Sequence, residues 1–539
     1  MKGNCYTKMQ KDTITYSETG YFSKLICHYL DQDERVTPFY HRFPSLENFE
    51  AQIIEKQAWF SSASRNALVT SLEKQYEQFS VSDATQLHIE KLSAATTFTI
   101  TTGHQLNLFT GPLYFLYKII HTITLSRKLK QQHPNYDFVP VYWMATEDHD
   151  FDEINYFRFK GSKIQWNRED GGAVGELSTE GLDAVLELFS TALGSSKNAQ
   201  YLASLFEEAY IKHSNLADAT RYLANELFGE YGLVIVDGND VGLKTLFAPY
   251  VERELFEEVA HQTVNSQTEK LTALGYPEQV HPREINLFYI IKGIRERIIR
   301  DGNDFVVNNT EIRFTETEIR SELQAYPERF SPNALLRPLF QEIILPNLTY
   351  IGGGGELAYW FQLKSCFEAM EVPFPMVLLR NSALIRTEKQ KKKTEALSIT
   401  DSQLFLKQNE LVNQKIRAIS NIDIDLSKQR QFLQEQFKEM HTLAAETDAS
   451  FIGAVKAQEV KQLKGLDHLE QRLLRAQKRK LKDQVQRVVD IQNAVFPLQS
   501  LQERNTNFAE FYLEFGTDLV PALLECLDPL GGEFTLVTL

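Results

Sequence analysis

The chain has 539 residues, 43% of them hydrophobic and 24% charged, which is typical of a globular protein with two or three domains, and its formal net charge is −15. This acidic balance argues against nucleic acid as a partner, because phosphate binding favours a basic surface. Four cysteines without a CxxC pair, no apolar leader and no apolar run of about 18 residues predict a cytoplasmic protein without a disulfide framework, zinc ribbon or membrane span.

From residue 97 the sequence alternates between strand and helix patterns. A β-branched strand at 97–101 is followed by an apolar helix at 112–132 and a second strand at 138–145. Two short strands joined by a crossover helix predict a parallel pair in a doubly wound sheet. The pattern recurs near 221–240 and 345–380. We therefore predict an α/β body over residues 1–385, with inserted modules at about 155–215 and 255–335.

The pattern changes after residue 385. Residues 402–495 are nearly free of glycine and proline, and apolar residues recur at three- and four-residue steps from Leu466 to Val488. This spacing predicts a coiled coil or a long helical hairpin over 386–495. The basic cluster at 478–482 is interpreted as a solvated face of that hairpin rather than a nucleic-acid patch. Residues 496–539 regain aromatic and turn-forming character, and we expect them to pack back on the body.

A first candidate site follows the strand at 97–101. A strand, a glycine turn and a helix start can direct free backbone N–H groups at an anion. Gly103, His104 and Gln105 would then hydrogen-bond a phosphate or carboxylate, with Lys118 supplying positive charge. An ordinary turn that satisfies its own backbone is an equal alternative, since neither GxGxxG nor Walker spacing is present.

A second candidate site is Glu147, Asp148, His149 and Asp150, which follow the apolar strand at 138–145. Ligands bind at the carboxyl ends of parallel strands in open α/β sheets. Such a cluster can act as general acid and base, bind an ammonium group or hold a divalent metal. Capping of a helix N-terminus would explain one or two of the acids but not the histidine.

A third candidate site is the stretch YIGGGGELAYW at 350–360. Consecutive glycines between a strand and a helix allow a ligand to approach the backbone closely, although a flexible loop is the competing explanation. Glu356 would lie in the first turn of the helix, with Tyr359 and Trp360 behind it. Arg337 could provide the positive charge for an anionic ligand.

These stretches together resemble the bacillithiol biosynthesis cysteine-adding enzyme family, BshC. The similarity is carried by TTGHQLNLFTGPLYFLYK, PVYWMATEDHDFDEI, INLFYIIKG, LLRPLFQEIILPNLTYIGGGGELAYW and LQERNTNFAEFYLEFG, in that order along the chain. The resemblance implies a Rossmann-like core with inserted modules and a coiled-coil domain that forms a homodimer. It also implies a ligase that joins the carboxyl group of L-cysteine to the amino group of glucosaminyl malate, the last step of bacillithiol assembly.

With this function, Glu147, Asp148, His149 and Asp150 become candidate catalytic residues. His104 departs from the glutamine that many family members carry. The candidate substrate-binding residues are Gly103, His104, Gln105, Thr110, Gly111, Tyr114, Lys118, Trp143, Arg337, Gly353, Gly354, Gly355, Glu356, Tyr359 and Trp360.

The activating cosubstrate is left open at this point. Amide synthesis from a free carboxylate is uphill, so ATP or ADP binding is expected, yet the chain has no clear HIGH or KMSKS signature. No metal is indicated, because EDHD lacks the spacing of helical zinc sites such as HExxH. Two other functions remain as alternatives: a metal-dependent hydrolase or transferase that uses the EDHD cluster, and a non-catalytic nucleotide-binding scaffold.

Overall fold

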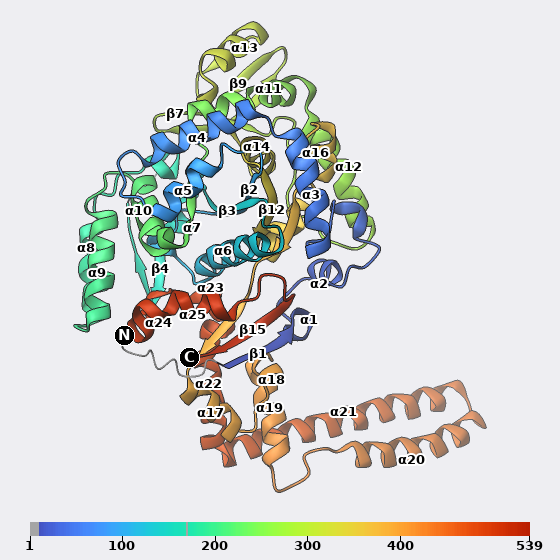
Figure 1. Cartoon of the computed structure of the whole chain (residues 1–539). Helices are drawn as coiled ribbons and strands as arrows, with labels where there is room; N and C mark the ends of the chain where they lie inside the picture. The colour runs from blue at the N-terminus through green and yellow to red at the C-terminus, as the bar shows by residue number, and fades with distance from the viewer. Residues whose placement is uncertain (1–9, 169–170) are drawn as a thin grey trace. The chain divides into compact units, whose positions relative to one another are not determined.

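The computed structural model describes residues 10–168 and 171–539 (Figure 1). The start of the N-terminal segment, on which the absence of a leader was predicted, lies outside these residues. The chain forms two compact units. Of the described residues, the first unit comprises 10–17, 21–168, 171–384 and 502–537, and the second comprises 18–20, 385–501 and 538–539.

The first unit is built on a five-stranded parallel sheet. In the order in which they pair, its strands are β13 (Met376–Leu379), β12 (Asn347–Gly352), β2 (Thr97–His104), β3 (Asp137–Met144) and β6 (Val234–Asp237). Along the chain, β3 and β6 extend the sheet on one side of β2, and β12 and β13 extend it on the other. The predicted doubly wound, Rossmann-like sheet is thus confirmed, and the strand order reverses between β2 and β12.

Helices pack against this sheet because its strands are apolar on both faces. Helix α6 (Tyr114–Gln132) contacts β2, β3 and β12, while α3 (Leu46–Trp59) contacts β12 (Figure 1). Helices α4 (Ser62–Tyr76) and α5 (Asp83–Lys91) contact β6. A buried apolar cluster joins α3, α6 and four strands, and its members are Phe49, Ile53, Phe98, Ile100, Leu125, Leu129, Phe138, Leu348, Ile351, Met376 and Leu378.

Strand β2 is longer than the sequence predicted. Gly103 and His104 were expected in a turn, but they pair with Trp143 and Met144 of β3 as the last two residues of the strand. The turn comes later, at residues 108–111, and α6 begins at Tyr114 rather than at Pro112. Continued pairing with β3 therefore carries the polar end of β2 to the edge of the sheet.

The two predicted insertions contain the remaining modules of the first unit. The segment at 155–215 includes a hairpin of β4 (Tyr156–Phe159) and β5 (Ser162–Gln165), followed by α8 (Leu182–Leu193) and α9 (Lys197–Tyr210). The segment at 255–335 holds a separate antiparallel sheet. Its strands are β7 (Leu287–Ile291), β8 (Ile294–Asp301), β9 (Asp304–Val307), β10 (Arg313–Phe314) and β11 (Phe330–Pro332).

Three further helices of the first unit carry residues of the candidate site that is described below. They are α11 (Val241–Glu257), α14 (Arg337–Ile344) and α15 (Gly354–Trp360). Residues 502–537 belong to this unit and contain α23 (Gln502–Asn505), α24 (Ala509–Phe515) and α25 (Leu519–Cys526).

The second unit is helical, as predicted. Helix α20 (Ser427–Ala445) packs against α21 (Ala449–Lys480) as a long hairpin, with Phe437, Ala444 and Val455 buried between them. Helix α19 (Gln408–Ile419) packs on α22 (Lys482–Val495). Within the described parts of the chain, no helix is both long enough and apolar enough to cross a membrane.

Candidate active site

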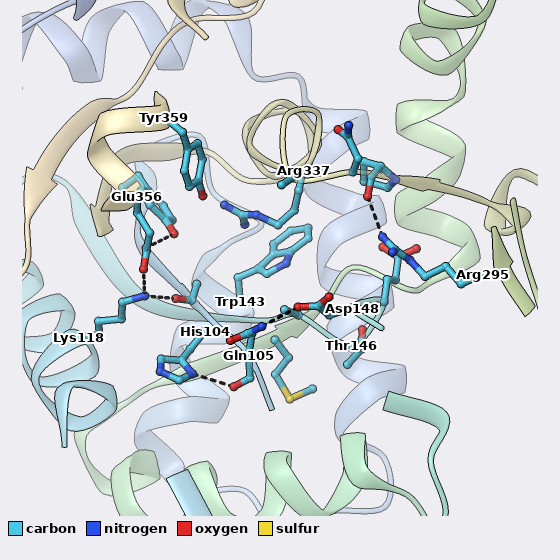
Figure 2. Close-up of a pocket in the computed structure, with 18 of the residues that line it drawn as sticks. His104, Gln105, Lys118, Trp143, Thr146, Asp148, Arg295, Arg337, Glu356 and Tyr359 are labelled. Carbon is cyan, nitrogen blue, oxygen red and sulfur yellow. Dashed lines mark hydrogen bonds and ion pairs between the residues drawn. The ribbon is translucent and has the colours of Figure 1, made fainter. Parts of the chain in front are cut away.

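A cavity of about 350 Å³ opens at the carboxyl ends of β2, β3 and β12 (Figure 2). It lies where the strand order of the sheet reverses, the usual ligand position in doubly wound folds. Its walls contain residues from all three candidate stretches. The lining residues are Gly103, His104, Gln105, Tyr114, Lys118, Trp143, Met144, Ala145, Thr146, Glu147, Asp148, Arg295, Pro332, Asn333, Ala334, Arg337, Tyr350, Glu356 and Tyr359.

Lys118, which is buried, and Glu356, which is partly exposed, form an ion pair in the wall of this cavity. Lys118 Nζ donates to Glu356 Oε1 and to the carbonyl oxygen of Gly103, both at 2.6 Å, and the Tyr350 hydroxyl donates to Glu356 Oε2 at 2.8 Å. Burial is the largest single influence and would raise the pKa of Glu356, but the charge and hydrogen bond of Lys118, together with the hydrogen bond from Tyr350, leave that pKa below its ordinary value. Lys118 was predicted to offer free charge to a ligand. Its charge is instead balanced by Glu356.

Gln105 joins the two polar strand ends. Its Nε2 donates to Asp148 Oδ2 at 2.9 Å and to Glu153 Oε2 at 2.9 Å. The Asp148 side chain keeps 29% of its surface exposed, and its Oδ1 accepts a hydrogen bond from the His149 backbone at 2.8 Å. Asp148 is therefore a solvated carboxylate in the cavity, held in orientation by an amide.

Glu147 contacts a cation that the sequence did not reveal. Lys244, near the start of α11, is completely buried, and its Nζ lies 2.5 Å from Glu147 Oε1. The same nitrogen donates to the carbonyl oxygen of Phe330 at 2.7 Å. Burial lowers the pKa of Lys244, while the negative charge of Glu147 opposes that shift. Because Glu147 is paired in this way and Asp150 does not line the cavity, Asp148 is the carboxylate of the cluster that faces the cavity without an ion pair to a lysine.

His149 and Asp150 lie outside the cavity wall. His149 is largely exposed, and its Nδ1 lies 2.8 Å from Nη1 of Arg295. The side chain of Asp150 caps the short helix α7 (Phe151–Ile154) by accepting from the Glu153 backbone. The four side chains of EDHD therefore do not converge on one point. Among the residues described, no group of three or more histidine, cysteine and acidic side chains is arranged to hold a metal ion.

Arg337 is the cation best placed to meet an anionic ligand. Its side chain lies beside the Trp143 ring (Figure 2). The guanidinium carbon is 5.7 Å from the ring centre of Trp143 and 5.5 Å from that of Tyr350. Nη1 donates to Gln341 Oε1 at 3.1 Å, whereas Nη2 has no hydrogen-bond partner among the described residues. No carboxylate within the described chain forms an ion pair with Arg337, so part of its donor capacity is available to a substrate.

Gly103 makes room for this guanidinium. A Cβ atom at position 103 would lie 3.3 Å from the Tyr350 hydroxyl and 3.4 Å from Arg337 Nη1. The glycine thus permits close approach of protein side chains, and it needs no unusual backbone angle, because it lies in a strand.

His104 is neutral in the folded protein. Its ring packs against Tyr114 and Phe115, and Nδ1 lies 2.8 Å from the carbonyl oxygen of Gln105. Burial, with a smaller contribution from the charge of Lys118, lowers the pKa of His104 to about 3. Since a carbonyl only accepts, Nδ1 carries the proton and Nε2 is the unprotonated nitrogen.

Six other predicted binding residues are not part of the cavity wall. Thr110 and Gly111 belong to the turn before α6, and Gly111 lines a second cavity. Gly353 is the N-cap of α15, and Gly354 and Gly355 form its first turn without reaching the cavity. Trp360 is fully buried and stacks on Tyr350 with ring centres 4.6 Å apart. It supports the wall from behind.

The cavity wall, and the residues that contact it from behind, also include side chains that the sequence did not single out. Arg295 comes from β8 in an insertion, and its charged neighbours there include two more arginines, so no sequence signal distinguished it. Lys244 follows the strand end VDGND as a single lysine in an apolar helix, a pattern that could have indicated it. Asn333 and Thr146 carry no comparable signal.

Comparisons with known proteins agree with this architecture. Residues 9–381 match the model for the bacillithiol biosynthesis BshC N-terminal Rossmann-like domain, and residues 383–539 match that for its C-terminal coiled-coil domain. Proteins named "Putative cysteine ligase BshC" from Christiangramia forsetii and Flavobacterium johnsoniae are each 57% identical to this chain over 98% of its length, covering 99% and 100% of their own. A protein of the same name from Cytophaga hutchinsonii is 37% identical over 96% of this chain and 97% of its own. The chain therefore belongs to the bacillithiol biosynthesis BshC family.

Proposed function

We propose that this protein is a cysteine ligase that completes bacillithiol by joining the carboxyl group of L-cysteine to the amino group of glucosaminyl malate. The observation that carries the proposal is that one cavity, in a chain of this family, gathers Gln105, Asp148 and Arg337 at the reversal point of the sheet. In this set, Arg337 is a cation that can bind a substrate carboxylate, and Asp148 is a solvated carboxylate that can accept a proton.

Arg337 binds a substrate carboxylate through its unpartnered Nη2. A guanidinium recognises a carboxylate through parallel hydrogen bonds, and the surrounding rings of Trp143 and Tyr350 exclude water from the contact. Lys118 contributes indirectly, by fixing Glu356 and the end of β2.

Asp148 accepts the proton that the amine must lose. The amine nitrogen attacks the carbon of the activated cysteine carboxyl, a C–N bond forms, and the activating group departs with its electron pair. The proton of the attacking nitrogen passes to Asp148, which Gln105 orients. Glu147 positions this segment through its pair with Lys244. Amide formation needs an activating cosubstrate, for which ATP is chemically suited, and we assign no residues to it.

The active protein is a cytoplasmic homodimer formed through the coiled-coil hairpin. Support comes from large apolar side chains that stay exposed on α20 and α21, with 67% of Phe432 and 55% of Leu469 accessible. A solvated monomeric hairpin rarely leaves such a row of apolar groups in water, because burial between two copies is favourable.

The decisive experiment is a profile of low-molecular-weight thiols and their precursors in cells that lack this gene. We expect bacillithiol to disappear and glucosaminyl malate to accumulate, with rescue by the native gene but not by Asp148→Asn. Unchanged bacillithiol in the deletion would contradict the proposal. Full rescue by Asp148→Asn would favour a non-catalytic scaffold.

A further inference from the structure

A second cavity, of about 310 Å³, adjoins the candidate active site. The two cavities share Gln105 and Tyr114 as lining residues, so these side chains form the partition between them. We refer to this second cavity as the arginine cavity. Its lining residues are Gln105, Asn107, Gly111, Pro112, Tyr114, Glu153, Tyr156, Phe157, Arg158, Arg504, Asn505 and Thr506.

Two arginines without charged partners line this cavity. Arg158 lies on β4 and is partly buried, whereas Arg504 lies on α23 and is exposed at the mouth of the cavity. Neither guanidinium forms an ion pair or a side-chain hydrogen bond with any residue that the structure describes. Glu153 is the one carboxylate in the wall, and its Oε2 already accepts from Gln105. Two cations against one engaged carboxylate leave the cavity with an excess of positive charge and free guanidinium donors.

The wall is held together by a buried asparagine. Asn507 Nδ2 donates to the carbonyl oxygens of Phe109 and Gly111, at 2.8 and 2.7 Å, and its backbone N–H donates to the carbonyl oxygen of Arg158 at 3.1 Å. The backbone N–H of Leu113 donates to Thr506 at 2.8 Å. Segments that are hundreds of residues apart in sequence are thus fixed to one another.

This fixation also maintains an unfavourable backbone. Phe109 and Thr110 both have left-handed φ values, of 46° and 66°, which cost free energy in residues other than glycine. The Tyr210 hydroxyl accepts from the Phe109 backbone at 2.8 Å and further restrains the turn. The arginine cavity is therefore a preorganised site.

We infer that the arginine cavity binds the dicarboxylate end of the acceptor while its amine extends past Gln105 and Tyr114 into the active-site cavity. This inference rests on the proposed function, because it takes the acceptor to be an amino sugar that carries a dicarboxylic acid. Two arginines suit two carboxylates, and the position next to the partition leaves Arg337 for the carboxyl group of cysteine. Gln105 then contacts both halves of the reaction site.

The test is calorimetric titration of the purified full-length protein with glucosaminyl malate, methyl glucosaminide and free L-malate. We expect Arg158→Gln and Arg504→Gln each to weaken glucosaminyl malate binding roughly tenfold or more, the loss typical of a charge-assisted hydrogen bond. Binding of methyl glucosaminide, which lacks the carboxylates, should not change. Arg283→Gln is the matched control, since Arg283 is exposed and lines neither cavity.

Free malate distinguishes the two sources of a dicarboxylate. We expect glucosaminyl malate to displace it and Arg504→Gln to abolish its binding. Malate that binds through the arginines but is not displaced would overturn the assignment to the acceptor, as would unchanged acceptor binding in both arginine variants. Failure of the native protein to bind glucosaminyl malate would instead contradict the proposed function.

Discussion

Gln105 and Asp148, at the ends of neighbouring strands, are joined by a hydrogen bond of 2.9 Å from the amide nitrogen to the carboxylate. The same nitrogen holds Glu153. A single neutral amide thus separates two carboxylates and fixes the one that faces the active-site cavity. The polarity of residue 105 should therefore control how readily Asp148 accepts a proton.

Replacing Gln105 with glutamate tests this control. A third carboxylate beside Asp148 and Glu153 should make Asp148 harder to ionise, because like charges repel one another. A base that is harder to ionise stays protonated up to a higher pH than in the native protein. The variant should therefore lose activity at a pH where the native protein is still active, and recover it as the pH rises. We expect the acidic limb of the kcat/KM profile to move upward by about one pH unit or more. An unshifted limb would contradict the role of Asp148. Gln200→Glu, on exposed α9, adds the same charge elsewhere and is the control.

Gly103 and Gly355 were both predicted to bind substrate, and the structure separates them. A Cβ atom at 103 would press on Tyr350 and Arg337, whereas one at 355 would meet nothing within 4 Å. We expect Gly103→Ala to raise the KM for cysteine about tenfold by displacing the guanidinium, a misplacement of the kind that costs orders of magnitude in other enzymes. Gly355→Ala should leave it unchanged. Steady-state kinetics on both variants decides the matter, and equal behaviour would argue against Arg337 as the carboxylate-binding group.

The neutral state of His104 has consequences for pH dependence. With a pKa of about 3, its ring should show no titration between pH 5 and 8 by NMR. The folded state binds fewer protons at this ring than the unfolded state between pH 6.5 and 3. The contribution of His104 to the free energy of unfolding is therefore fully present above pH 6.5 and is lost as the pH falls toward 3. His104→Gln should keep activity and lessen this acid sensitivity, measured by chemical unfolding at several pH values. A histidine resonance that titrates near pH 6.5 and disappears in the variant would refute the assignment.

The fold was predictable because its signals are local. The apolar strands, the crossover helix at 112–132 and the glycine-poor helices each depend on hydrophobic spacing, which the sequence displays directly. The site was predictable only in part. Gln105 and Asp148 could be predicted because each follows a strand, and the carboxyl ends of parallel strands lie at the same edge of a sheet. Arg295 lines the cavity from an inserted sheet, and Lys244 contacts the lining residue Glu147 from α11, so the positions of both depend on tertiary packing.

Lys56 and Glu342 form an ion pair with no exposed surface, their nitrogen and oxygen 3.2 Å apart. Removing one partner leaves a buried charge, so Lys56→Met should destabilise the α/β unit by about 3 to 5 kcal/mol. Adding Glu342→Gln should restore much of that loss. Lys91→Met, which breaks a half-exposed pair with Asp137, should cost less than about 1 kcal/mol. Urea unfolding of the four proteins measures these differences. No recovery in the double variant would show that packing, rather than charge, sets the cost.

The coiled-coil hairpin offers a direct test of dimerisation. Phe432 and Leu469 line one groove between α20 and α21, and each keeps more than half of its surface exposed, at 67% and 55%. A glutamate at either position would place a charge in an apolar contact between two copies, at a cost that a solvated hairpin would not feel. We expect Phe432→Glu and Leu469→Glu to shift sedimentation from dimer to monomer while leaving helix content unchanged. Leu188→Glu, at a residue 62% exposed on α8, should remain dimeric. A native protein that sediments as a monomer would rule out the homodimer, and the exposed row would then need a different partner.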